Sequence, residues 1–143
     1  MALANTRQRK PAIALCQSDH EKLTGLAEVW SERNPAVSEE LLGELERARI
    51  VPDSRMRDDV IRMGSTLRYV TDTGDDRTVT LVYPGEADIS SGKVSILTPI
   101  GTALIGLSPG QSIDWQGRDG RLHRLTIESA EPPEVDPAMR RAS

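Results

Sequence analysis

An α+β fold is predicted for this chain of 143 residues, with helices in its first half and a sheet in its second. Up to about residue 50, apolar residues recur at the spacing of an amphipathic helix. From about residue 60 they alternate with polar residues, as they do in strands with one buried face. Glycine, proline and aspartate cluster between these alternating stretches, which is typical of turns. The sequence therefore predicts a short helical hairpin followed by an antiparallel sheet with one short helix.

The first helix is expected to begin at Ser18, because Ser18 and Glu21 form a capping-box pattern. Its apolar stripe consists of Leu23, Leu26, Ala27 and Trp30. Asn34 and Pro35 end this helix and start the next, Asn34 as the N-cap and Pro35 at the first helical position. The second apolar stripe consists of Val37, Leu41, Leu45 and Ala48. Helices joined by so short a turn lie antiparallel, and at ~1.5 Å per residue this hairpin is roughly 20 Å long.

A linker is expected after the hairpin, because Val51-Pro52-Asp53-Ser54 joins a helix-ending proline to turn-favouring residues. Arginines are concentrated around this linker: Arg47, Arg49, Arg55, Arg57, Arg62 and Arg68. Two interpretations of them stay open. They are a solvated face in which arginines alternate with aspartates, or they form a contact strip for an acidic partner surface.

Five strands are expected in the second half, around residues 67–71, 79–83, 93–97, 113–115 and 122–127. The first two strands, and likewise the last two, form hairpins around glycine-containing turns. The short helix covers residues 100–105, with Thr98 as its N-cap, Pro99 at its first position and Gly106 at its end.

The composition excludes several functions. Aromatic residues make up 3% of the chain and Phe is absent, so no stacking platform for bases can be assembled. A net charge of -4 argues against generic nucleic-acid binding, and no specific DNA readout is expected. The single Cys16 permits no internal disulfide and fits a reducing compartment. No signal core and no apolar run of the ~20 residues that a membrane helix needs is found, so a soluble, cytoplasmic protein without membrane contact is expected.

No catalytic, cofactor or metal site is predicted. His20 and His123, even with Cys16, lack the spacing of zinc ligands. Ser65 has no His and Asp constellation near it, and the glycines of the short helix lack the Lys-Ser/Thr pair of a phosphate loop. We therefore expect a protein that is not itself an enzyme and that uses no cofactor.

Three motifs of the second half occur together in one known family. They are Gly64-Ser65, Glu86-Ala87-Asp88 after Val82-Tyr83-Pro84, and the run Thr98–Gly106. In this order and spacing they resemble the C-terminal domain of the GreA/GreB transcript-cleavage factors, over about residues 60–128. Two positions depart from the family's pattern, since Thr98 stands where Ser is usual and Gln111 where Asp is usual.

The first half is similar to a branch of that family with a short helical arm, named regulator of nucleoside diphosphate kinase (Rnk). The similarity rests on Leu41–Arg49 followed by Val51-Pro52, and on Asp58-Asp59-Val60 before the sheet. With this resemblance the chain divides into a flexible N-terminus (1–16), a short helical hairpin (17–50), a linker (51–59), a GreA/GreB C-terminal-type domain (60–130) and a flexible tail (131–143).

The resemblance implies that the sheet domain is FKBP-like and docks at the rim of the secondary channel of RNA polymerase. We expect the docking loop to be Leu97, Thr98 and Pro99, with Glu86 and Asp88 framing the same surface. The fold also suggests peptidyl-prolyl isomerase activity, but the chain lacks the aromatic residues that line such a pocket, and fold analogy alone is a poor warrant.

The hairpin tip is expected to carry Glu32, Asn34, Glu39 and Glu40. In the cleavage factors a pair of carboxylates at the tip of a long arm helps the polymerase to hold a second Mg²⁺ ion. The acids of this tip do not reproduce that motif. Glu39 and Glu40 have a simpler explanation, because carboxylates in the first turn of a helix interact favourably with its dipole.

The sequence thus predicts a polymerase-binding regulator of transcription that competes with Gre-type factors and has no cleavage activity. Two alternatives stay open. One is a regulator that acts through another protein partner, linked to nucleoside diphosphate kinase, and the other is a true transcript-cleavage elongation factor.

Overall fold

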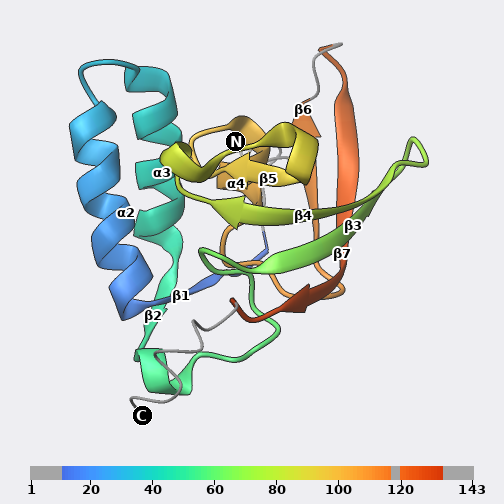
Figure 1. Cartoon of the computed structure of the whole chain (residues 1–143), viewed down its shortest axis with the longest axis horizontal. Helices are drawn as coiled ribbons and strands as arrows, with labels where there is room; N and C mark the ends of the chain where they lie inside the picture. The colour runs from blue at the N-terminus through green and yellow to red at the C-terminus, as the bar shows by residue number, and fades with distance from the viewer. Residues whose placement is uncertain (1–10, 117–119, 134–143) are drawn as a thin grey trace, which may run out of the picture.

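The computed structural model describes residues 11–116 and 120–133. Its first half consists of two helices that lie side by side at the edge of the molecule (Figure 1). Helix α2, Gln17–Trp30, follows strand β1, Ala14–Cys16, without a break. Helix α3, Pro35–Arg47, leads into strand β2, Arg49–Val51.

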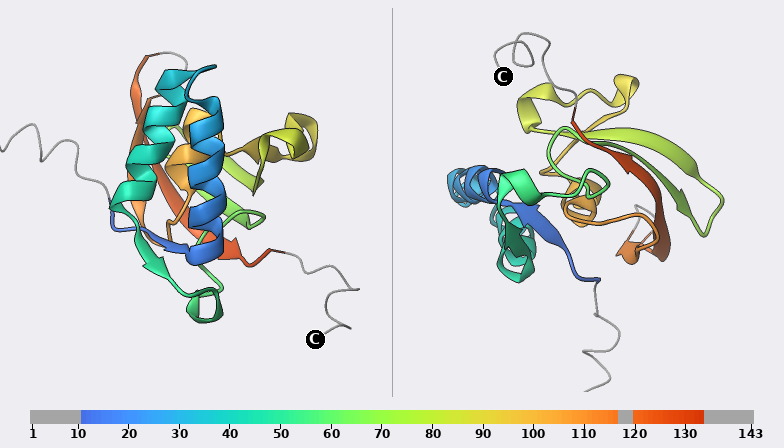
Figure 2. Two further views of the ribbon diagram at one scale, coloured as in Figure 1. Left: turned by 90° about the vertical axis from the view of Figure 1, so that its left-hand side faces the viewer. Right: turned by 90° about the horizontal axis from the view of Figure 1, so that it is seen from below.

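A five-stranded sheet forms the second half, with the strand order β5-β4-β3-β7-β6. Its strands are β3 (Thr66–Thr71), β4 (Asp76–Val82), β5 (Lys93–Ser95), β6 (Ser112–Gln116) and β7 (Leu122–Glu131). The short helix α4, Pro99–Leu104, lies within the curve of this sheet (Figure 2). Three 3-10 turns complete the described chain: η1 (Asp53–Arg55), η2 (Pro84–Glu86) and η3 (Ile89–Ser91).

The prediction of a wholly antiparallel sheet is wrong at one edge. β5 pairs with β4 in parallel, whereas the β3–β4, β3–β7 and β6–β7 pairs are antiparallel. A parallel pair needs a long connection, and here the chain between β4 and β5 makes two 3-10 turns before it returns. Strand direction at this edge depends on that connection, which the alternating pattern of the strand does not encode.

The N-terminal boundary also differs from the expectation. Residues 1–10 lie outside the described part of the chain, but residues 14–16 form β1, which pairs in parallel with β2. Ile13, Leu15 and Cys16 are buried, so these residues belong to the folded core and not to a flexible N-terminus. At the other end, β7 extends to Glu131, and residues 134–143 lie outside the described part.

The two helices begin in different ways. Asn34 caps α3 as predicted, with its side chain accepting a hydrogen bond from the backbone N–H of Val37 at 3.4 Å. The predicted capping box of α2 is wrong, because the helix begins at Gln17 with Cys16 as its N-cap. The backbone N–H of Ser18 instead donates to Oδ1 of Asp53 at 3.0 Å. The first turn of α2 is thus capped by a residue 35 positions away.

One hydrophobic core joins the helices to the sheet. Its fully buried members include Leu23 and Leu41 from the hairpin, and Leu81 and Leu125 from the sheet. Between the helices, the Ser38 hydroxyl donates to the Ala27 carbonyl at 2.7 Å, and Nε2 of His20 lies 3.2 Å from the Leu45 carbonyl oxygen. Among the described residues, no helix is long and apolar enough to cross a membrane.

Candidate functional site

The predicted docking loop leads from β5 into α4. Leu97 is half-buried against the core, whereas Pro99 is exposed. Thr98 caps α4 as predicted, since its hydroxyl oxygen accepts from the Gly101 N–H at 3.0 Å while it donates to the Ser95 carbonyl at 2.7 Å. A loop held at both ends in this way presents Pro99 on a rigid scaffold.

Close backbone packing fixes the position of this loop further. A Cβ atom at Gly101 would overlap the carbonyl oxygen of Ser95, so α4 can approach the end of β5 only because residue 101 is glycine. The buried hydroxyl of Thr102 donates to the carbonyl of Ile96 at 2.7 Å. The loop therefore has little freedom to rearrange between β5 and the helix.

Glu86 and Asp88 lie in the connection between β4 and β5, and both are exposed. Glu86 is the last residue of η2, and Asp88 is the N-cap of η3. Both turns pack against β5, as α4 does. The Asp88 carboxylate accepts from the Ser90 N–H at 3.2 Å and from the hydroxyls of Ser90 and Ser91 at 2.6 and 2.9 Å. Hydrogen bonds from these two serines hold the pKa of Asp88 below its ordinary value. Asp88 therefore caps η3 as a charged group, beside the strand that leads to the docking loop.

The hairpin tip carries the four predicted residues, Glu32, Asn34, Glu39 and Glu40, and all are exposed. Asn34 acts as a helix cap, whereas Glu39 and Glu40 lie one turn farther along α3. The Arg33 guanidinium lies 5.6 Å from the centroid of the half-buried Trp30 ring beside them. Among the described residues, no group of three or more side chains is placed to hold a metal ion.

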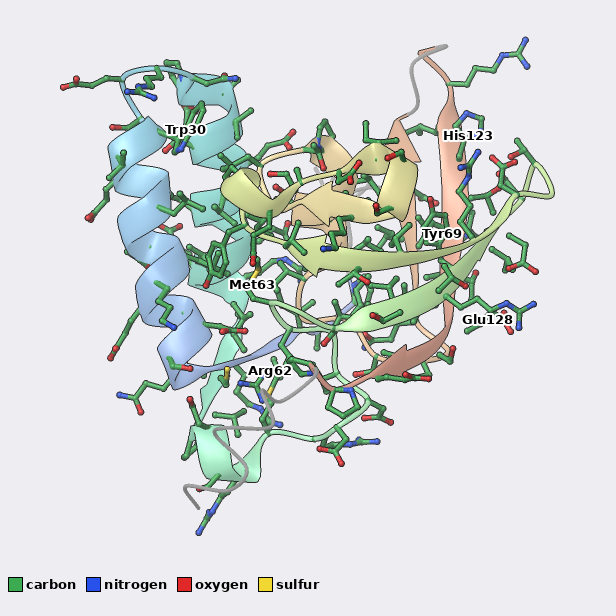
Figure 3. All side chains as sticks on the ribbon, viewed as in Figure 1. Trp30, Arg62, Met63, Tyr69, His123 and Glu128 are labelled. Carbon is green, nitrogen blue, oxygen red and sulfur yellow. The ribbon has the colours of Figure 1, made fainter. Side chains whose placement is uncertain are left out.

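The junction between the hairpin and the sheet domain was not foreseen as a site. Asp19 is buried on α2, and its Oδ2 accepts from the Met63 N–H at 3.0 Å and lies 3.9 Å from Nε of Arg62. Figure 3 shows Met63 and Arg62 beside the lower half of the helices, on the side that faces the sheet domain. The pKa of Tyr83 is raised to about 12, mainly by burial and secondly by the negative charge of Asp19. Asp19 lies between the two residues that predicted the start of this helix, and no sequence signal links it to Met63.

The arginine-rich segment divides into two groups. Four arginines form ion pairs: Arg47 with Glu44, Arg57 with Asp59, Arg62 with Asp19, and Arg68 with Asp76, at 2.8, 3.0, 3.9 and 2.7 Å. For Arg49 and Arg55 the described part of the chain offers no carboxylate within ion-pair distance. Ion pairing within the chain accounts for the first group, which favours the solvated-face interpretation there. Arg49 and Arg55 instead line a pocket.

Two protein families match adjoining parts of the chain. Residues 56–132 match the family described as Transcription elongation factor, GreA/GreB, C-term, and residues 11–51 match the Rnk N-terminus. The second match ends at β2 and the first begins just before the sheet domain, so the boundary between them falls at η1.

Two relatives match most of this chain. The regulator of nucleoside diphosphate kinase from Escherichia coli (strain K12) is 32% identical over 128 residues, which cover 88% of this chain and 94% of that protein. The transcription elongation factor GreA from Bartonella henselae is 35% identical over 131 residues, covering 85% and 83%.

A solved structure has the same fold. The prokaryotic transcription elongation factor GreA/GreB from Nitrosomonas europaea is 34% identical, with a TM-score of 0.69 over 83% of this chain and 98% of that one. Sequence and structure thus agree over the hairpin and the sheet domain together. The chain belongs to the GreA/GreB transcription elongation factor family, and its N-terminal part is of the Rnk type.

Proposed function

We propose that this protein is a transcription regulator that docks on RNA polymerase at the rim of the secondary channel. It would compete there with Gre-type factors and would not stimulate transcript cleavage. The observation that carries the proposal is the docking loop itself, in which Pro99 is exposed while Thr98 is fixed by two hydrogen bonds. A rigid exposed loop loses little conformational entropy when it binds.

The sheet domain, which we propose to be FKBP-like, is the anchor in this mechanism. The loop and the turns η2 and η3 pack around one strand, β5, and bring Glu86 and Asp88 to the same region of the domain. Charges at the rim of an interface mainly steer association and select the partner. Glu86 and Asp88 would therefore favour a basic surface next to the loop.

The short hairpin is the reason to propose binding without cleavage. α2 and α3 contain 14 and 13 residues, and at ~1.5 Å per residue they reach roughly 20 Å. Assistance to a catalytic metal ion requires carboxylate oxygens within coordination distance of it. Glu39 and Glu40 lie near the N-terminus of α3, where negative charge stabilises the helix dipole. The protein would then act only by occupying the channel mouth and excluding other factors from it.

A second candidate function is regulation through another protein partner. It is favoured by one specific observation, the name regulator of nucleoside diphosphate kinase borne by a relative that matches 88% of this chain. The two functions differ in the protein that is bound, so one binding experiment separates them.

The test is a binding titration of the full chain with bacterial core RNA polymerase, in the presence and absence of GreA. Saturable binding that GreA displaces is the expected result. A transcript-cleavage assay on stalled elongation complexes should show no stimulation. If no complex forms at micromolar concentrations, polymerase docking is rejected and the second candidate takes its place.

Two matched variants locate the contact. Thr98→Arg places a long cation in the docking loop and should abolish polymerase binding. Thr73→Arg makes the same change at the exposed turn between β3 and β4, on the side of the sheet away from the helices (Figure 1), and should bind normally. Replacing Glu39 and Glu40 together by alanine should also leave binding intact. Loss of binding in that tip variant would show that the hairpin, and not the sheet domain, is the anchor.

A further inference from the structure

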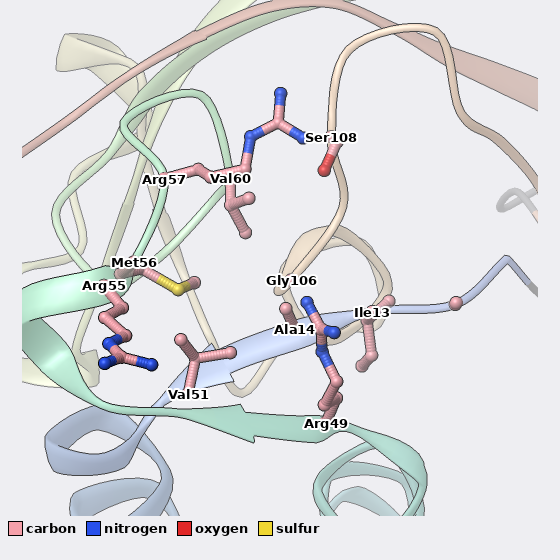
Figure 4. A pocket seen from close by; sticks show the side chains of 11 residues that line it. Ile13, Ala14, Arg49, Val51, Arg55, Met56, Arg57, Val60, Gly106 and Ser108 are labelled. Carbon is pink, nitrogen blue, oxygen red and sulfur yellow. The ribbon is translucent and has the colours of Figure 1, made fainter.

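A pocket opens where the base of the hairpin meets the sheet domain. Its volume is about 310 Å³, at the lower end of the ~300–1,000 Å³ range of small-molecule sites. β1 and β2 form one side, η1 and the residues after it form another, and the chain after α4 closes the third (Figure 4). The site is thus built from both halves of the molecule.

Glycine at position 106 makes this arrangement possible. Gly106 has φ +81°, and a Cβ there would lie 2.8 Å from Cβ of Ile13 and 3.1 Å from the carbonyl oxygen of Ala14. The Gly106 carbonyl accepts a hydrogen bond from the Ala14 N–H at 3.3 Å. β1 therefore packs directly against the chain after α4, and the pocket lies beside this contact.

The pocket combines an apolar lining with positive charge. Val51, Met56 and Val60 provide aliphatic and thioether surface, and none of the described residues that line the pocket is acidic or aromatic. The guanidinium groups of Arg49 and Arg55 lie on either side of Val51 (Figure 4). Neither of these arginines is within ion-pair distance of a carboxylate in the described part of the chain. The described part of the chain therefore does not neutralise the positive charge of these two arginines.

We propose that this pocket binds a compact organic anion. Its phosphate or carboxylate group would lie between Arg49 and Arg55, because the planar guanidinium fork matches the oxygens of either group. Its short aliphatic part would pack on Val51 and Met56. The absence of aromatic side chains from the lining disfavours a nucleobase, which is usually bound by stacking.

Arg57 is placed to adjust the strength of this site. It also lines the pocket, but its exposed guanidinium is 3.0 Å from the half-buried Asp59 carboxylate. A surface pair of this kind is weak, so an anion in the pocket can compete for Arg57. β2 contributes Arg49 to the pocket, and the chain beyond η1 contributes Arg57. An anion bound to both would therefore stabilise the contact between the hairpin and the sheet domain.

The test is a titration of the full chain by isothermal calorimetry and thermal unfolding, with four probes. n-Butyl phosphate and hexanoate carry the two anionic groups on aliphatic chains, inorganic phosphate has no aliphatic part, and 1-butanol has no charge. We expect saturable binding of n-butyl phosphate or hexanoate and a raised unfolding temperature. Inorganic phosphate should bind more weakly, and 1-butanol should not bind. The stronger of the first two identifies the anionic group.

Two variants and a control show where the probe binds. Arg49→Gln with Arg55→Gln should weaken binding at least about tenfold, since two charge-assisted contacts are lost. Val51→Trp should block the aliphatic part while the arginines remain. Arg77→Gln removes an exposed arginine of β4 that is likewise outside ion-pair distance of any described carboxylate, and it should bind as the native chain does. Circular dichroism checks that each variant is folded.

Several outcomes would overturn the proposal. They are a failure of both organic anions to bind at millimolar concentrations, and equal binding by the double-arginine variant. Binding of a polyglutamate peptide that the small anions do not displace would assign the pocket to a protein partner instead. Anion binding does not depend on polymerase docking. A chain that binds no anion can still bind polymerase, and the reverse, so the two titrations test the two proposals separately.

Discussion

The helical hairpin and the sheet domain are stabilised by different kinds of contact. α2 and α3 have 14 and 13 residues, close to the ~12–15 residues below which isolated helices are marginal in water. They depend on side chains that reach other segments, as Asp19 reaches the Met63 N–H and Asp53 reaches the Ser18 N–H. In the sheet, β3 is hydrogen-bonded on both sides, by β4 and β7. Both regions share one hydrophobic core. The helices add a few long-range side-chain hydrogen bonds to it, whereas the sheet adds backbone pairing along whole strands.

The largest effects are expected from core truncations, which ask whether the two regions unfold separately. Leu41→Ala in α3 and Leu81→Ala in β4 each remove a side chain with 0% exposure. Each should cost about 2–5 kcal/mol of unfolding free energy. Because both leucines belong to one core cluster, each variant should unfold in a single transition in urea, followed by circular dichroism and tryptophan fluorescence. Two separate transitions for Leu41→Ala would show that the hairpin is an independent unit.

The next largest effect is expected at the base of the hairpin. Asp19→Ala removes the buried acceptor of the Met63 N–H and the acid nearest to Arg62. We expect a loss of about 1.5–3 kcal/mol, as for a hydrogen bond to a charged group. Asp19→Asn retains an acceptor and should cost less, which urea denaturation of the two variants can measure. An Asp19→Ala variant as stable as the native chain would mean that the apolar contacts alone hold the hairpin in place.

A smaller effect is expected from the two exposed carboxylates that cap turns and helices. Hydrogen bonding to Ser18 lowers the pKa of Asp53, and hydrogen bonding to Ser90 and Ser91 lowers that of Asp88. A lowered pKa in the folded state adds stability above the unfolded pKa, and this stability is lost as pH falls through the folded value. In Asp53→Asn the free energy of unfolding should therefore depend less on pH in the acid range. Amide exchange in the first turn of α2 should become faster. Asp88→Asn should change amide exchange in η3 alone, and faster exchange in α2 would contradict this.

The smallest effect on stability is expected from Tyr83→Phe. The Tyr83 hydroxyl is buried, with no hydrogen-bond partner among the described residues, so its removal should be neutral or slightly stabilising at pH 7. A folded pKa of about 12 lies above the ordinary value of 10.0, and stability should fall as pH rises from 10 toward 12. Tyr83→Phe should reduce this alkaline loss, measured by urea unfolding at pH 9 and pH 11. Burial raises the pKa of Tyr69 as well, so Tyr69→Phe should reduce the alkaline loss in the same direction and serves as a second test.

The sequence was sufficient for the parts of the fold that local patterns encode. The helical stripes predicted α2 and α3, and alternation placed β3, β4, β6 and β7. Thr98-Pro99 and Asn34-Pro35 predicted two helix starts correctly, because an N-cap acts within one turn of its own chain. These features require no knowledge of tertiary structure.

The features that the sequence did not predict depend on partners far away in the chain. β1 and β2 have three residues each, too few for an alternating pattern, and they pair across 35 positions. The contact of Asp19 with Met63 spans 44 positions. The pocket likewise combines arginines of one segment with backbone of another. The docking loop was predicted from its motif, and its binding to polymerase is tested by the titration with core enzyme.

The parallel pairing of β1 with β2 has a consequence for the evolution of this fold. The two ends of the helical hairpin are joined by backbone hydrogen bonds at its base, with Ala14 opposite Arg49 and Cys16 opposite Val51. The helices are thus an insertion between two neighbouring strands, and their length is not constrained by the sheet. Seven residues added to each helix would extend the arm by about 10 Å without moving the base. Arms of different reach can therefore arise on one unchanged domain by insertion or deletion of whole helical turns.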